Sequence, residues 1–248
     1  MAASKIDCVI RGAGIIGLSC ALGLAQRGAQ VILVEPRWPP RGASWAAAGM
    51  IAPAFEAAGR AGVHAGLFEA CLQSAQMWPD WSARLEVLSG MSSGYSPEAS
   101  IALAVDKETE AELNKIRAAL GLHGLAREAL EENDLPKAAI NGLRLPTDTQ
   151  VDNRKTMAAL ISVCEGHERI EVIPEWSNEW GMPQLITAGW ETQGLLPHPL
   201  PIYPLSGQMV SLERGAGDPQ VPVRCGALYI VPKDDRIIVG ATVEKDVV

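Results

Sequence analysis

The chain has 248 residues, of which 48% are hydrophobic and 20% are charged, and its formal net charge at pH 7 is −8. This composition predicts a globular protein with one large domain or two modest ones. It argues against a nucleic-acid-binding protein, which needs a basic surface, and no apolar run approaches the ~20 residues of a membrane-spanning helix.

The cysteines and histidines form no pattern of metal ligands. The five cysteines include no CxxC pair, and the four histidines lack the spacing of a metal site. Several cysteines lie in apolar contexts, which favours buried thiols in a reducing compartment. The first residues lead directly into a predicted strand and show no signal-peptide pattern. We therefore expect a cytoplasmic protein without a metal site.

The first 35 residues predict a βαβ unit that binds a dinucleotide. An apolar run over 6–11 precedes Gly12-Ala13-Gly14-Ile15-Ile16-Gly17, a GxGxxG turn that opens a helical pattern over 15–27. A second apolar run over 30–35 ends in an acid, Glu35, at 18 residues after Gly17. This order of strand, glycine turn, helix, strand and acid is more specific than the glycines alone. The alternative is a glycine-rich turn in another kind of parallel-sheet protein.

Each part of this unit has its own physical role. Gly12 permits the tight turn, Gly14 lets a pyrophosphate approach the backbone, and Gly17 lets the helix lie close to the sheet. The helix N-terminus offers N–H groups and a positive dipole end to phosphates. Glu35 is placed to accept hydrogen bonds from the adenosine ribose. Arg11 stands at the last strand position, where a buried guanidinium needs a carboxylate or solvent.

The remaining chain predicts alternating helices and strands. Pro36 to Gly42 is a predicted loop, and Ser44 is expected to cap a following alanine-rich helix. Further helices are expected over 62–88, either continuous or broken at Pro79, and over 106–120, 124–132 and 151–164. Strands are expected over 100–105, 142–145 and 170–173. Residues 203–213 and 227–243 form β-rich stretches, the second with a turn at Asp234-Asp235.

Three groups of residues resemble one known family. The segment from Gly12 to Glu35 is followed by Arg41-Gly42-Ala43-Ser44-Trp45-Ala46-Ala47-Ala48-Gly49-Met50. Farther along come Pro204-Leu205-Ser206-Gly207-Gln208, then Tyr229-Ile230-Val231-Pro232 with Gly240-Ala241-Thr242. Together they resemble the glycine oxidase branch of the D-amino-acid oxidase family, which consists of FAD-dependent oxidoreductases.

The resemblance implies an α/β fold: a Rossmann-like βαβ FAD-binding domain with an interleaved α+β substrate domain on a mainly antiparallel sheet. Val151-Asp152-Asn153-Arg154 and Leu185 to Trp190 match points where the family's chain returns to the FAD domain. The implied division is 1–90 and 151–198 for the FAD-binding domain, and 91–150 and 199–248 for the substrate domain.

The resemblance also implies the site. FAD would contact backbone and small side chains at Gly12, Gly14, Ile15, Ile16, Gly17, Glu35, Ser44, Ala47, Ala48, Gly49, Met50, Ala188 and Gly189. Tyr229 would lie near the substrate, although a tyrosine packed in a hairpin is an equally good interpretation of this residue. No Ser-His-Asp or Cys-His constellation is present, which suits chemistry carried by a flavin.

The implied reaction is oxidative deamination of a small amino acid or amine, such as glycine, sarcosine or a D-amino acid. Its products are a keto or aldehyde acid, ammonia and hydrogen peroxide, with oxygen as acceptor, and thiamine biosynthesis is the implied context. A related FAD dehydrogenase with another electron acceptor, a non-catalytic FAD-binding remnant and, less well supported, an NAD-dependent dehydrogenase remain alternatives.

The sequence departs from the family pattern in two places. The region between 173 and 185 is short. The family's Gly-x-Arg-Pro segment, whose arginine binds the substrate carboxylate, would lie beyond Val248, so the matches cover about the first two-thirds of the pattern. We therefore expect this chain alone to be a poor oxidase, and a homo-oligomer or a partner chain to cover the surface that the segment would occupy.

Overall fold

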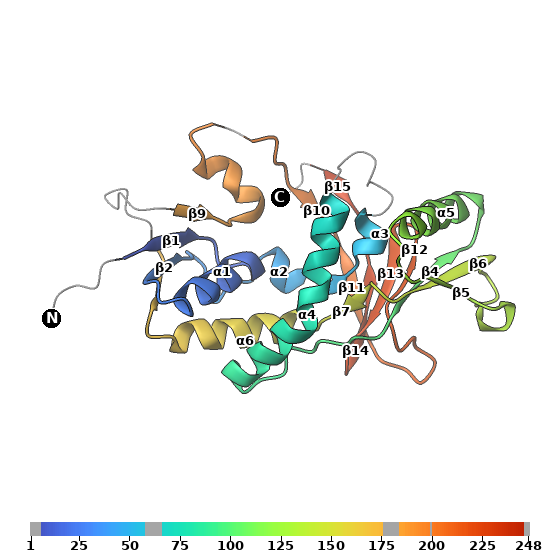
Figure 1. Ribbon diagram of the computed structural model, residues 1–248, viewed down its shortest axis with the longest axis horizontal. Coiled ribbons are helices and arrows are strands. Elements are labelled where there is room, and N and C mark those ends of the chain that lie inside the picture. Colours follow the sequence, from blue (N-terminus) through green and yellow to red (C-terminus); the bar gives the residue numbers. More distant parts are fainter. Residues whose placement is uncertain (1–5, 58–65, 176–183, 199, 246–248) are drawn as a thin grey trace.

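The protein is built on two sheets that lie at opposite ends of its long axis (Figure 1). The computed structural model describes residues 6–57, 66–175, 184–198 and 200–245. Positions 62–65 of the long helix predicted from residue 62 lie outside the described residues. The predicted α/β class, with a βαβ unit and a second, mainly antiparallel sheet, is confirmed.

The first sheet is parallel and has the strand order β8-β2-β1-β9. Its strands are β1 (Cys8–Arg11), β2 (Val31–Val34), β8 (Ile170–Ile173) and β9 (Gln184–Ile186). Cys8 lies opposite Val31 and Arg11 opposite Val34, so the two apolar runs of the βαβ unit are neighbours, as predicted. Val31 to Val34 are all buried, which is typical of parallel strands covered on both faces.

Two helices cover one face of this sheet. Helix α1 (Ile15–Ala25) directs Leu18, Ala21 and Leu22 into the core, and α6 (Asn153–Gly166) contributes Met157 and Leu160. The N-cap of α6 is Asp152, whose carboxylate accepts hydrogen bonds from the N–H groups of the first turn. The predicted helix from residue 151 is therefore confirmed, with its first helical residue at 153.

The second sheet has seven strands in the order β11-β14-β13-β12-β4-β6-β5, antiparallel except where β12 meets β4. The strands are β4 (Ser100–Ala104), β5 (Glu128–Ala129), β6 (Asn141–Leu145), β11 (Met209–Glu213), β12 (Val223–Cys225), β13 (Leu228–Pro232) and β14 (Arg236–Gly240). Helix α5 (Lys107–Leu122) packs Leu113, Ile116 and Leu120 onto it, and Asp106 caps this helix.

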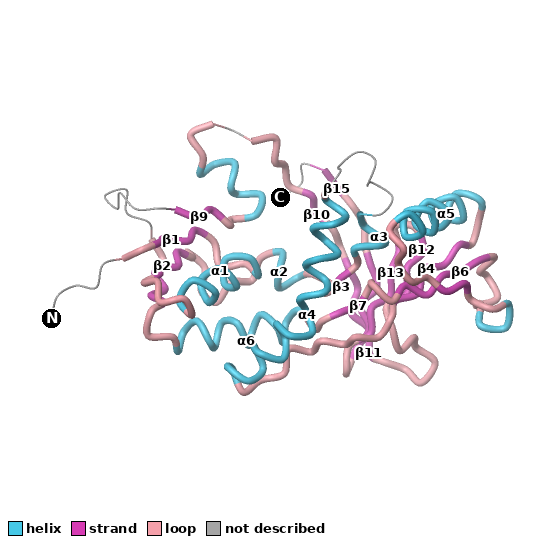
Figure 2. Tube along the Cα trace, viewed as in Figure 1, coloured by secondary structure: helices cyan, strands magenta, loops and turns pink. Residues whose placement is uncertain are grey.

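Short elements join the two sheets, as the tube in Figure 2 shows. The chain leaves β2 through α2 (Ala43–Ala46), β3 (Met50–Ile51) and α3 (Pro53–Ala57), and β3 pairs with β7 (Thr149–Gln150). The long helix α4 (Leu67–Ser89) lies between the sheets, and η3 (Gly189–Leu195) follows β9. Near the end, β10 (Leu205–Ser206) pairs with β15 (Glu244–Lys245).

The local structure differs from the expectations, or adds to them, in three places. Residues 124–132 form no helix: β5 and the 3-10 turn η2 (Glu132–Asp134) occupy this region, because the Leu130 N–H donates to the Gly142 carbonyl of the sheet. Pro79 does not break α4, since buried Phe68 and Leu85 hold the helix on either side of it. Strand β12 was not predicted, because three residues with a central arginine give no strand pattern.

Candidate functional site

The glycine turn lies at the carboxyl end of β1 and is held by backbone contacts. The Gly12 N–H donates to the Val34 carbonyl at 2.9 Å, and Gly12 has a φ of +102°. A Cβ on Gly12 would stand 2.8 Å from the Thr187 carbonyl group. A Cβ on Gly17 would stand only 1.9 Å from the Gly12 oxygen, so the first turn of α1 rests directly on the strand end. Both glycines are therefore required by packing.

Gly14 and Ser44 meet at the N-terminus of α1. The Ile15 N–H donates to the Ser44 hydroxyl oxygen at 3.0 Å, and a Cβ on Gly14 would approach that oxygen to 3.2 Å. Ser44 was expected to cap its own helix, and that expectation is wrong. Gly42 is the N-cap of α2, and the hydroxyl instead satisfies a first-turn N–H of the neighbouring helix. The following first-turn N–H groups, at Ile16 and Gly17, have no acceptor within the helix.

Glu35 stands beside the glycine turn, as the βαβ pattern requires. Its carboxylate accepts hydrogen bonds from the Ala13 N–H and the Arg37 N–H, both at 3.1 Å, and the residue is half-buried. A cavity of about 540 Å³ adjoins it. The cavity is lined by Glu35, Pro36, Trp38, Glu165, Ile170, Val172, Ile173 and Pro174. Glu35 lies at the carboxyl edge of the parallel strands, where ligands bind in open α/β sheets, and the cavity extends from there along β8 to its first residue, Ile170.

The segments after β2 and β9 meet over the end of β1. Ala188 and Gly189 follow β9, and Gly189 begins η3 with a φ of +60°. From this turn Glu191 accepts a hydrogen bond from the Arg37 guanidinium at 2.9 Å. We call the part of the carboxyl edge of β1 where the Gly12 turn, Glu35, Ser44 and Gly189 lie together the crevice.

The segment Ala47 to Met50 leads from the crevice to the seven-stranded sheet. Ala47 is exposed and Ala48 is buried. Gly49 has a φ of +80°, and a Cβ there would lie 2.3 Å from the Val151 oxygen. The same oxygen accepts a hydrogen bond from Lys233 Nζ at 2.5 Å. Met50 then pairs with Gln150 in the β3–β7 ribbon.

Lys233 and Asp148 are buried charged groups that sequence reasoning missed. Burial lowers the pKa of Lys233 to about 8, with nearby Asp152 acting in the opposite direction. Burial raises the pKa of Asp148 to about 6, against hydrogen bonds from the Ala54 and Phe55 N–H groups that favour its charged form. No local pattern marks either residue, because their burial depends on segments far away in the chain.

Tyr229 lies on β13, within a row that crosses the sheet. It is paired with Gly240 on β14, which is paired with Met209 on β11, and its hydroxyl donates to the Met209 sulfur at 2.9 Å. The side chain is half-buried, and burial raises the pKa of its hydroxyl. Gly240 leaves the tyrosine room, since a Cβ there would stand 2.6 Å from the hydroxyl.

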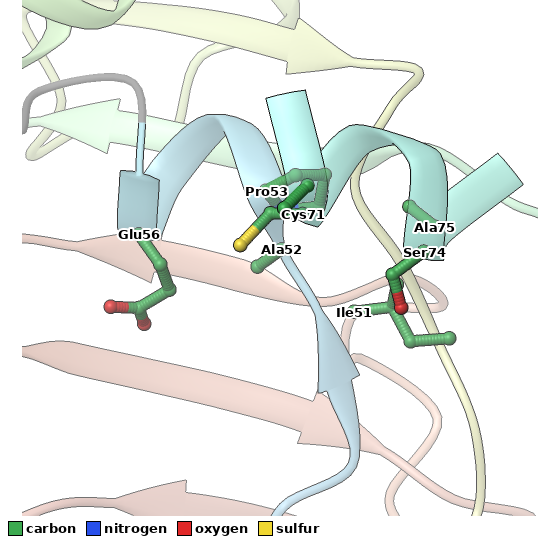
Figure 3. A pocket seen from close by; sticks show the side chains of 8 residues that line it. Ile51, Ala52, Pro53, Glu56, Cys71, Ser74 and Ala75 are labelled. Carbon is green, nitrogen blue, oxygen red and sulfur yellow. The ribbon is translucent and has the colours of Figure 1, made fainter. Parts of the chain in front are cut away.

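A second cavity lies between β3, α3 and α4, beyond the Ala47–Met50 segment (Figure 3). Its volume is about 360 Å³, and its lining is Ile51, Ala52, Pro53, Glu56, Ala70, Cys71, Ser74 and Ala75. Glu56 is the one charged residue of this lining within the described part of the chain, and its carboxylate points away from the other labelled side chains.

The geometry thus separates the predicted site residues into two places. The crevice brings together the residues from Gly12 to Gly17 with Glu35, Ser44, Ala188 and Gly189, whereas Tyr229 lies on the seven-stranded sheet. The segment from Ala47 to Met50 connects them. The described residues contain no group of three or more potential metal ligands, and none of their helices is long and apolar enough to cross a membrane.

Comparison with known proteins gives a consistent result. A family model described as DAO, FAD dependent oxidoreductase, matches residues 7–247. The curated "Bifunctional protein ThiO/ThiG" of Trichormus variabilis is 30% identical to this chain. The match covers 96% of this chain and 40% of that protein. Its counterpart from a Synechocystis species is 32% identical, and the match covers 96% of this chain and 39% of that protein. The chain therefore spans about two fifths of the length of these relatives.

Solved structures have the same fold. Glycine oxidase from Geobacillus kaustophilus has a TM-score of 0.86 at 24% identity and covers 97% of this chain and 72% of that one. Glycine oxidase from Bacillus cereus has a TM-score of 0.81 at 22% identity, covering 98% and 72%. L-proline dehydrogenase from P. horikoshii has a TM-score of 0.73 at 18% identity, covering 95% and 69%.

Proposed function

The chain belongs to the DAO family of FAD-dependent oxidoreductases, and on this premise we propose that it takes part in the oxidation of a small amine or amino acid. FAD, the cofactor of this family, supplies the acceptor for the electron pair that leaves the carbon bearing the amine. The crevice is the observation that carries the proposal. It joins a helix N-terminus, a hydroxyl and a carboxylate around a glycine turn, which suits a pyrophosphate with a ribose beside it.

In the proposed assignment, each residue of the crevice has one task. The N–H groups at Ile16 and Gly17 and the Ser44 hydroxyl hold the pyrophosphate. The Glu35 carboxylate accepts hydrogen bonds from the ribose hydroxyls, and Ala188 and Gly189 close the side next to β9. The segment from Ala47 to Met50 supports the ring end of the cofactor, because its small residues leave room beside the backbone.

On the substrate side, Tyr229 is proposed to lie against the substrate. Its hydroxyl and ring orient the amine. The proposed substrates are glycine, sarcosine or a D-amino acid. Oxygen is the proposed acceptor, and ammonia, hydrogen peroxide and a keto or aldehyde acid are the products. The likeness to proteins that carry ThiO in their name supports a proposed role in thiamine biosynthesis, and the proposed location is the cytoplasm.

The test begins with the cofactor and then asks for chemistry. Purified protein is incubated with FAD, desalted and examined for a flavin absorption spectrum. Loaded protein is then mixed with glycine, sarcosine or D-alanine without oxygen, and loss of flavin absorbance is recorded before air is admitted.

Bleaching by an amine followed by peroxide release would support the oxidase. Bleaching without peroxide would indicate a dehydrogenase with another acceptor. A bound flavin that no amine bleaches would contradict oxidation by this chain, and failure to retain FAD would contradict the assignment of the crevice.

A further inference from the structure

A buried arginine on the substrate side lacks a full set of hydrogen-bond partners. Arg224 is the central residue of β12 and is 8% exposed. Its Nη1 donates to a Glu56 oxygen at 2.5 Å, while its Nε is buried without an acceptor in the described structure. A guanidinium carries five N–H donors in a planar fork, so most of its capacity is unused. An unpaired buried donor is costly. An anion that accepts hydrogen bonds from the free N–H groups of this arginine would remove that cost.

The surroundings orient this guanidinium. Arg224 is paired across the sheet with Tyr229, and its Cζ lies 3.8 Å from the centre of the Phe55 ring and 5.9 Å from that of Tyr229. Phe55 is itself fixed, because Asp148 accepts a hydrogen bond from its N–H. Stacking on an aromatic ring holds the guanidinium plane in place while leaving its N–H edge available.

Glu56 both pairs with Arg224 and lines the smaller cavity of about 360 Å³. Its side chain is 55% exposed. Glu56 can therefore turn into solvent when another carboxylate takes its place on Arg224, so that the buried guanidinium is never left unpaired. A ligand carboxylate that engages two N–H groups of the fork forms the stronger contact and can displace Glu56.

We infer that Arg224 binds a carboxylate group of the amine substrate and that Glu56 occupies this position until the substrate arrives. The inference rests on the proposed function and adds to it the residue of this chain that holds an acid group of the substrate. Arg224 would hold the acid group while Tyr229, its neighbour across the sheet, faces the same ligand. The carboxylate can be the one next to the amine or a second acid group farther along the molecule.

The experiment measures binding of carboxylates by isothermal titration calorimetry on FAD-loaded protein. Glycolate serves as a monocarboxylate probe and malonate as a dicarboxylate probe. Arg224→Gln should weaken binding about 10–100-fold, the scale of a charge-assisted bidentate contact. Glu56→Gln should tighten binding about two- to fivefold, because the competing carboxylate is gone. Loss for both probes alike identifies the carboxylate next to the amine, and loss for malonate alone identifies a second acid group.

Arg144→Gln is the matched control. Arg144 lies on β6 of the same sheet and forms an ion pair with Glu128 at 3.8 Å, but its side chain is 42% exposed and it neighbours Leu143 of the core, so it faces the other side. This variant should bind both probes as the unmodified protein does. Arg224→Lys, which keeps the charge without the fork, should lie between the Gln variant and the unmodified protein.

Unchanged affinity in Arg224→Gln, or no gain in Glu56→Gln, would overturn the inference. If Arg224→Gln does not fold, as judged by circular dichroism, the exposed Glu56 variant decides alone. Failure to retain FAD would count against the proposed function instead, and the same titrations on the cofactor-free chain would still test Arg224.

Discussion

The crevice and the seven-stranded sheet depend on different kinds of groups. The crevice relies on backbone N–H groups, glycines and one half-buried carboxylate, Glu35. The seven-stranded sheet and its junction with the parallel sheet contain all four buried charged residues of the described chain: Asp148, Asp152, Arg224 and Lys233. The crevice therefore depends on shape and is sensitive to added atoms. The seven-stranded sheet and its junction depend on charge and are sensitive to pH.

The largest effect is expected where a single carbon is added beneath the crevice. Gly17→Ala would place a Cβ 1.9 Å from the Gly12 oxygen, so the helix must move off the strand end. We expect a loss of about 3 kcal/mol in the free energy of unfolding, the upper part of the range for overpacking. FAD binding should be lost as well. Urea unfolding followed by circular dichroism measures the first effect, and flavin titration the second.

Gly23→Ala in the same helix is the control for this prediction. A Cβ there would meet only the Arg27 side chain, at 3.5 Å, and alanine is favoured over glycine in a helix by about 0.5–1 kcal/mol. This variant should be as stable as the unmodified protein or slightly more stable. Equal stability of the two variants would show that α1 does not rest on the turn.

The carboxylate of the crevice should matter for the cofactor more than for the fold. Glu35→Ala removes the proposed ribose acceptor and should weaken FAD binding by about 1–3 kcal/mol, measured by fluorescence titration. Glu171→Ala, at an exposed position on the neighbouring strand β8, should leave the affinity unchanged. Equal affinities in the two variants would remove Glu35 from the site.

Asp148 allows a test of the charged side through pH. Its folded pKa of about 6 lies above the usual aspartate value of 3.8, so the folded protein keeps a proton that the unfolded chain releases. The unfolding free energy of the unmodified protein, relative to that of Asp148→Asn, should therefore fall as the pH rises from 4 to 6. The variant should also lose about 1–2 kcal/mol at pH 4, because an amide accepts fewer hydrogen bonds from Ala54 and Phe55.

Asp106 is the opposite case and serves as the control. Hydrogen bonds from Thr109 hold the pKa of this exposed helix cap below its usual value. Its contribution to stability is present above pH 4 and is lost as the pH falls further. The unfolding free energy of the unmodified protein, relative to that of Asp106→Asn, should therefore rise with increasing pH, opposite to the Asp148 pair. The same slope in both pairs would contradict the burial of Asp148.

Lys233 should produce a slope at alkaline pH. Its folded pKa of about 8 lies below 10.5, so the unfolded chain binds more protons between these values. The cost of its buried charge is fully present below pH 8 and disappears as the pH rises to 10.5. Relative to Lys233→Met, the unmodified protein should therefore gain stability over this range. Chemical unfolding at pH 7.5, 9 and 10.5 provides the measurement, and a flat difference would contradict the prediction.

The smallest effect is expected at the ion pair that spans the crevice. Arg37 and Glu191 are 77% and 46% exposed, and such pairs contribute about 0–1 kcal/mol. Arg37→Ala should change the unfolding free energy by less than about 0.5 kcal/mol. A larger loss, measured by urea unfolding, would show that the turns after β2 and β9 depend on this contact.

The βαβ unit was determined by the sequence alone. Its strands, glycine turn, helix and terminal acid are consecutive in the chain, and each is specified by local residue types. For the same reason Asp106 and Asp152 could be expected at helix starts. The resemblance to a known family added the second sheet and the role of residues 44–50.

Tertiary structure alone decided which charges are buried and what they face. Arg224 meets Glu56 across 168 positions of sequence, and Lys233 reaches the Val151 carbonyl across 82. Ser44 turned out to serve helix α1 rather than its own helix, and Pro79 stayed within α4, because contacts from distant segments outweigh local preference. A sequence specifies local conformation through neighbouring residues, whereas burial, and the pKa that follows from it, exists only once remote segments have come together.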